Sequence, residues 1–171
     1  MRQLFLTLFT LFIIQASGQS FITYKDTINR FSIDIPVGWK YGVNRNYPAI
    51  KLLAYRTPLS QLDTSRDNFN INIIETPNKN LDKTFADFLK YLPEAKNYKL
   101  IDTGDTAFNG IKLKWLIETH ENEKNIKLHN FDFVALKEDK TYILTMVTFS
   151  YAFDAVKPLF NKIAGSFRLV N

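Results

Sequence analysis

Cysteine is absent from this sequence, which excludes disulfide bridges, thiolate chemistry and a lipid-modified cysteine. Histidine is nearly absent, because His120 and His129 are the only imidazoles. No glycine-rich phosphate loop, Gly-x-Ser-x-Gly elbow or His-Glu-x-x-His motif occurs. Carboxylates such as Glu118 and Asp132 have no spacing that marks them as an acid/base pair. The sequence therefore predicts no catalytic residue, cofactor or metal, and we expect the chain not to be an enzyme.

Runs of like charge are also missing. The formal net charge is +5, but Lys and Arg are scattered along the chain, whereas nucleic-acid binding requires a clustered basic surface. We therefore expect no nucleic-acid partner. Lys112 and Lys114 alternate on one predicted strand face and, with Lys127, Lys137 and Lys140, could form a basic surface toward an acidic partner. A solvated strand face is the alternative interpretation.

The longest apolar run is too short to cross a membrane. Residues 4–14 are apolar apart from two threonines and lie between a positively charged start and the small residues 16–18, which is the pattern of a secretory signal peptide. Such a run, at about 1.5 Å per residue, cannot span a hydrocarbon core of roughly 30 Å. We expect a signal peptide over residues 1–18 that is cleaved before Gln19. One secreted or periplasmic domain, residues 19–171, then remains without a stable membrane anchor.

Large apolar side chains are abundant in the rest of the chain. Hydrophobic residues make up 46% of the sequence, aromatic residues make up 15%, and fifteen residues are Phe, so we expect a globular core rich in rings. Alternating apolar and polar residues predict strands. The predicted strands are 21–27, 31–35, 49–56, 69–75, 98–103, 111–121, 126–136 and 142–149. The polar segment 57–68 between two of them is predicted to be a surface loop that is either functional or mobile.

Two segments have the apolar spacing of amphipathic helices. The first is residues 81–92, with Asn80 as its N-cap. The second presents an apolar stripe over residues 156–167, with Asp154 as its predicted cap and Pro158 in its first turn.

The two histidines flank a predicted hairpin turn, so their geometry depends on strand register. In one register they face each other and could hold a metal. A shift of one residue instead pairs Trp115 with Phe133 and allows Asn125 to adopt the left-handed conformation. Apolar matching favours this second register, in which the imidazoles point to opposite faces.

Three segments of the chain are distinctive when taken together. They are FSIDIPVGW (residues 31–39), DNFNINI (residues 67–73), and residues 141–149 with the following segment through residue 167. In these segments the sequence resembles the PsbP-like family, which includes exported bacterial domains of the DcrB type. The resemblance implies an α+β fold with a central antiparallel sheet flanked by helices on both faces, an α/β/α sandwich. It also implies a noncatalytic role at the surfaces of other proteins. The matched residues do not identify a functional site in this chain.

The corner after residue 36 poses a separate question. Trp39 could fold over the end of the sheet and bury on the order of 200 Å², which would stabilise the fold by several kcal/mol. Alternatively, Trp39, Tyr41 and Tyr47 could line the mouth of a binding pocket. The candidate binding residues are therefore Trp39, Tyr41, Tyr47, Lys112 and Lys114.

We expect an exported noncatalytic domain that binds another protein or assists an envelope assembly. The alternative is a carrier of a small apolar ligand, held in a cavity between the sheet and the helix at residues 81–92. An enzyme would require a cleft in which a histidine and a carboxylate converge.

Overall fold

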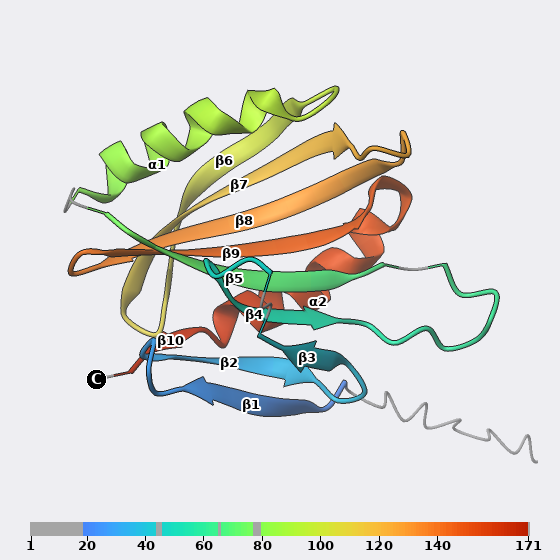
Figure 1. Cartoon of the computed structure of the whole chain (residues 1–171), viewed down its shortest axis with the longest axis horizontal. Coiled ribbons are helices and arrows are strands. Elements are labelled where there is room, and N and C mark those ends of the chain that lie inside the picture. The colour runs from blue at the N-terminus through green and yellow to red at the C-terminus, as the bar shows by residue number, and fades with distance from the viewer. Residues whose placement is uncertain (1–18, 44–45, 65, 77–79, 171) are drawn as a thin grey trace, which may run out of the picture.

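The computed structural model describes residues 19–43, 46–64, 66–76 and 80–170. Within these residues the chain forms two antiparallel sheets and two α-helices (Figure 1). The larger sheet has the strand order β3-β4-β5-β9-β8-β7-β6, and the smaller one has the order β1-β2-β10. The predicted signal peptide, residues 1–18, lies outside the described residues. In the described part of the chain, neither helix combines the length and the apolar character that crossing a bilayer requires.

The larger sheet comprises β3 (Lys40–Gly42), β4 (Ile50–Tyr55), β5 (Asn68–Glu75), β6 (Lys99–Phe108), β7 (Ile111–Glu121), β8 (Lys127–Lys137) and β9 (Lys140–Phe149). The smaller sheet comprises β1 (Phe21–Asp26), β2 (Phe31–Pro36) and β10 (Arg168–Leu169). The helices are α1 (Leu81–Tyr91), which is followed by the 3₁₀ turn η1 (Leu92–Glu94), and α2 (Phe153–Gly165), which is preceded by the 3₁₀ turn η2 (Ser150–Ala152).

One face of the larger sheet, the inner face, carries three rows of apolar side chains. Each row crosses neighbouring strands because facing residues share a face and side chains alternate along a strand. The rows are Phe69-Met146-Phe131-Ile117, Ile71-Leu144-Phe133-Trp115 and Ile73-Tyr142-Ala135-Leu113. Almost all of these side chains are buried, so the alternation read from the sequence defines the main core.

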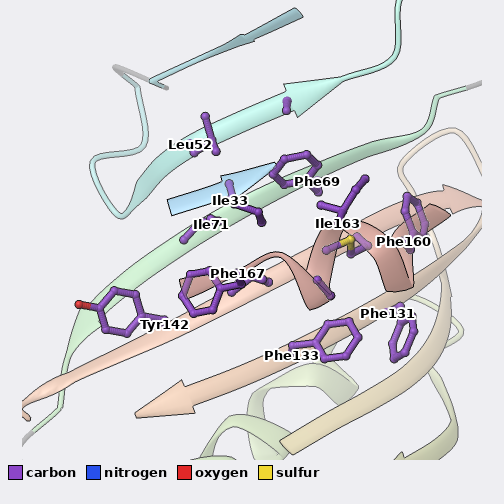
Figure 2. Close-up of a cluster of buried hydrophobic side chains, with 14 of the residues drawn as sticks. Ile33, Leu52, Phe69, Ile71, Phe131, Phe133, Tyr142, Phe160, Ile163 and Phe167 are labelled. Atoms are coloured by element: carbon purple, nitrogen blue, oxygen red, sulfur yellow. The ribbon is translucent and has the colours of Figure 1, made fainter. Parts of the chain in front are cut away.

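Helix α2 and the smaller sheet cover these rows. Phe160 and Ile163 of α2 and Phe31 of β2 are fully buried in the same cluster. Phe167 joins the layers, because its ring centroid lies 6.3 Å from that of Phe31 and 6.0 Å from that of Tyr142. Figure 2 shows these rings and branched side chains converging between the strands and the helix. Burial of this apolar surface is the main stabilising contribution to the fold.

Helix α1 packs against the other face of β7 and β8, the outer face. Phe85 contacts Leu116, Val134 and Ile143 in a second hydrophobic cluster. The predicted N-cap is confirmed, because the Asn80 side chain accepts a hydrogen bond from the Lys83 amide at 3.0 Å. The predicted antiparallel sheet is present, and the structure adds a three-stranded sheet that the α/β/α description did not include.

Three local expectations were wrong. Asp154 does not cap α2, because η2 leads directly into a helix whose N-cap, Ala152, makes no side-chain hydrogen bond. Pro158 therefore lies inside the helix rather than in its first turn. Strand β6 also extends to Phe108, so that residues predicted as a connection pair with β7 instead.

The register of the β7–β8 hairpin is confirmed. Trp115 faces Phe133, and Thr119 rather than His120 faces His129. Asn125 adopts a left-handed φ of 59° in the turn. The two imidazoles therefore point to opposite faces of the sheet.

Gly104 on β6 should resist substitution because Trp115 lies directly over it. A Cβ atom at Gly104 would lie 2.7 Å from the Trp115 ring, whereas a Cβ at Gly42 would meet nothing within 4 Å. We predict that Gly104→Ala lowers the free energy of unfolding by about 1–3 kcal/mol. Gly42→Ala should change it by no more than about 0.5 kcal/mol. Urea unfolding of the mature chain measures both, and equal effects of the two substitutions would contradict this packing.

Candidate functional site

The predicted aromatic residues do not gather at one pocket. Trp39 is 8% exposed and belongs to the main core, where its ring centroid lies 6.1 Å from that of Phe69. This position agrees with the interpretation that Trp39 closes the end of the sheet. Tyr41 and Tyr47 instead remain 47% and 64% exposed. The corner therefore divides into a buried tryptophan and two exposed tyrosines.

The predicted basic pair is partly neutralised within the chain. Lys112 and Lys114 occupy alternate positions of β7 and so share the outer face. The Lys114 ammonium lies 2.7 Å from the carboxylates of both Asp82 and Asp105, and these hydrogen bonds raise the pKa of Lys114. Only Lys112 of this pair is exposed, so the two residues do not form a strong surface for an acidic partner.

The two histidines lie in different environments and contact different residues. His120 Nδ1 lies 3.0 Å from Oε1 of Glu118. The His129 ring stacks on Phe153 at 4.4 Å between centroids and 13° between planes. Burial and the nearby Lys127 lower the pKa of His129. In the described ranges, no three His, Asp or Glu side chains are arranged to hold a metal.

A buried carboxyl pair lies on the outer face, and it is formed by two carboxylates whose spacing in the sequence did not mark them as a pair. Glu118 on β7 and Asp132 on β8 are each 2% exposed. Asp132 faces Leu116, two residues from Glu118, so the carboxyls are diagonal neighbours on one face. Burial raises the pKa of Asp132 to about 7, a hydrogen bond from Thr145 opposes this rise, and the Glu118 charge adds to it. Burial also raises the pKa of Glu118, which the neighbouring His120 opposes.

Such perturbed carboxyls are often found at active sites, but burial closes this pair. One carboxyl oxygen of Asp132 is buried without a hydrogen-bond partner, so no donor at that oxygen stabilises the charged form against burial. The register of the hairpin was the signal that could have identified the pair, because it places Glu118 and Asp132 on the same face. We interpret them as structural residues, since both side chains are buried within the sheet and its covering helix.

The most distinctive exposed feature is the loop between β4 and β5, residues 57–64 and 66–67, which we call the arm. Arg56 at its base contacts two of its carboxylates. Nη2 of Arg56 lies 2.6 Å from Asp63, and Nε lies 3.0 Å from Asp67. Asp67 is itself buried and accepts a hydrogen bond from the Thr148 hydroxyl at 2.6 Å. These contacts hold the arm to the sheet.

The arm displays apolar side chains to solvent. Leu59 and Leu62 are 84% and 91% exposed, although the Leu59 amide donates a hydrogen bond to Asp63 at 2.8 Å. In Figure 1 the arm projects beyond the end of the sheet. The sequence predicted a surface loop here, but it did not distinguish these leucines from other apolar residues. Their exposure on an ion-paired loop makes the arm our candidate functional site.

Two open pockets flank the arm. One, of about 920 Å³, lies between the arm and the β7–β8 turn and is lined by Thr64, Arg66, Lys96, Glu121, Asn122, Glu123, Lys124, Ile126 and Phe149. The other, of about 480 Å³, is lined by Leu53, Tyr55, Arg56, Pro58, Arg66, Asp67 and Asn68. Both pockets combine charged side chains with apolar ones such as Phe149 and Leu53.

The buried carboxyl pair gives a test of its structural role. Asp132 binds a proton more tightly in the folded chain than in the unfolded chain, where its pKa is near 3.8. Its contribution to stability is therefore full below about pH 4 and is lost as pH rises through about 7. We predict that Asp132→Asn removes a pH-dependent loss of a few kcal/mol between these limits. The exposed control Asp102→Asn should retain this pH-dependent loss of stability. The free energy of unfolding is measured with urea at several pH values from 4 to 8, and the same dependence on pH in both variants would refute the assignment.

Known proteins share this fold. The PsbP family profile matches residues 19–169. Cyanobacterial PsbP (CyanoP) from Synechocystis sp. PCC 6803 has a TM-score of 0.67 and 20% identity, with 91% of this chain and 95% of that protein covered. LpqN, which is involved in cell envelope biogenesis of Mycobacterium tuberculosis, has a TM-score of 0.62 and 8% identity, with 92% and 88% covered.

PA94 from Pseudomonas aeruginosa, a protein of unknown function, has a TM-score of 0.60 and 13% identity, with 85% of this chain and 94% of that protein covered. At these identities the structural likeness shows the fold alone. A search of curated proteins gives no match. Because the family profile extends over nearly all described residues and CyanoP has the same fold, the chain belongs to the PsbP family, as its sequence predicted.

Proposed function

We propose that this chain is an exported, noncatalytic domain that uses the arm to bind another protein and thereby assists an envelope assembly. The observation that carries the proposal is the exposure of Leu59 and Leu62 on a loop that Arg56 holds through two carboxylates. Large apolar side chains exposed on a surface loop lower the solubility of a protein. A partner surface that buries them would offset this effect.

The surroundings of the arm support a polypeptide partner. Tyr55, on the strand that leads into the arm, is 44% exposed, and tyrosine is enriched in protein interfaces. The Thr57 hydroxyl donates a hydrogen bond to the Gly38 carbonyl at 2.9 Å, which ties the base of the arm to the Trp39 corner. The exposed Tyr41 follows that corner. Tyr41 faces Ala54 and Tyr55 faces Lys40, so the two tyrosines lie on opposite faces of the sheet, and Tyr55 is the one on the strand that leads into the arm.

The cellular setting rests on two supports. The N-terminal residues have the pattern of a signal peptide, and LpqN, which has a similar fold, is involved in cell envelope biogenesis. A noncatalytic role is supported by the closed carboxyl pair and by the separation of the two imidazoles. We therefore place the partner in the envelope rather than in the cytoplasm.

The test is affinity capture with matched surface variants. The mature chain, residues 19–171, is incubated with envelope extract of the organism that encodes it, and captured proteins are identified by mass spectrometry. We predict that Leu59→Ser combined with Leu62→Ser reduces recovery of a specific partner by about tenfold or more, because two exposed anchors are lost. Cell fractionation with an antibody to the chain tests its export.

The control is Ile28→Ser, which alters an 87% exposed residue in the β1–β2 turn, at the opposite end of the molecule from the arm (Figure 1). All variants should have the wild-type unfolding midpoint, because the altered side chains are exposed. The proposal fails if the arm variant and wild type capture the same partners in equal amounts, or if Ile28→Ser causes the same loss.

A further inference from the structure

A pocket of about 290 Å³ opens on the inner face between strands β6, β7 and β8 and helix α2. Its lining comes from three strands and the helix. Ile117, Phe131 and Phe133 line it among buried residues, whereas Phe108 and Trp115 are half-buried. The carrier alternative placed a cavity under α1, on the outer face, where apolar side chains instead pack against one another. This pocket therefore lies on the opposite face of the sheet from the predicted cavity.

The aromatic walls of this pocket support one another. The Trp115 ring meets Phe131 edge to face at 5.9 Å between centroids. Phe133 lies 4.4 Å from Phe131 and 5.7 Å from Phe108 by the same measure. Trp115 lies over Gly104, which leaves the room that its ring occupies. Rings fixed by such contacts form a site that needs little rearrangement to accept an apolar group.

A lysine ammonium group lies at the rim of this apolar pocket. Lys157 on α2 lines it, and its ammonium lies 5.8 Å from the ring centroids of both Phe131 and Phe153. Among the residues that the structure describes, Lys157 has no carboxylate within ion-pair distance. Asn161 also lines the pocket, one turn further along α2, and supplies an amide donor. A positive charge and an amide above an aromatic floor favour a ligand with an anionic end and an apolar body.

We propose that this pocket binds a small amphipathic carboxylate, with its ring or short acyl chain against Trp115 and Phe133 and its carboxylate toward Lys157 and Asn161. The volume is at the lower end for ligand sites, so it suits one ring or a short chain rather than a long lipid. A cationic ligand would be repelled by Lys157, and an uncharged one would leave the ammonium unpaired. The site lies away from the arm and does not depend on the proposed protein-binding role.

The experiment is an NMR titration of the mature chain with sodium octanoate, with octanol as the uncharged probe. The indole resonances of Trp39 and Trp115 are assigned with the Trp115→Phe variant. We expect octanoate to shift the Trp115 indole and leave that of the buried Trp39 unchanged. Lys157→Ala should weaken octanoate binding by about tenfold and leave octanol binding unchanged, since only the charged contact is lost.

Lys162→Ala, an exposed lysine on the same helix, is the matched control and should bind octanoate like wild type. Unchanged octanol binding in Lys157→Ala shows that the pocket is intact. The proposal is overturned if millimolar octanoate leaves the Trp115 indole unshifted. It is equally overturned if octanol binds wild type as tightly as octanoate does, or if Lys157→Ala and Lys162→Ala bind octanoate alike.

Discussion

The structure depends on the burial of three apolar rows that cross the larger sheet and face α2 and β2. Side chains alternate along a strand, so fixing these rows also fixes which residues point outward. Phe133 can lie in the core only if its neighbours Asp132 and Val134 lie on the outer face. Burial of the rows thus determines both the core and the chemistry of the opposite face.

This constraint explains why the buried carboxyls and His129 are packed within the fold rather than gathered at an open site. Asp132 and Glu118 share the outer face and are closed off from solvent, while His129 stacks on Phe153. The arm has the reverse arrangement, with its charges directed inward to Arg56 and its leucines outward. The proposed binding surface therefore lies on a loop, which can vary without altering the rows that stabilise the sheet.

The sequence was most informative where the alternation of apolar and polar residues along a strand, or their matching between facing strands, decides the structure. Alternation placed Phe69, Ile71 and Ile73 on one face, and apolar matching selected the β7–β8 register, as observed. It was least informative where tertiary contacts decide. The smaller sheet forms because β10 returns to β2 after α2, which no local pattern shows. The arm was predicted as a loop, but its ion pairs join Arg56 to Asp63 and Asp67, which lie several positions away, and no local pattern predicts these contacts.

The central claim is that the function resides on the arm and not at the group of Glu118, His120 and Asp132. The most direct measurement is photo-crosslinking in the native cell, with a photo-reactive phenylalanine analogue replacing Leu62 in one variant and His120 in another. Both side chains reach the surface, since Leu62 is 91% exposed and the His120 side chain is 19% exposed. We predict a crosslink to another envelope protein from position 62 and none from position 120. A crosslink from position 120 together with none from position 62 would contradict the account.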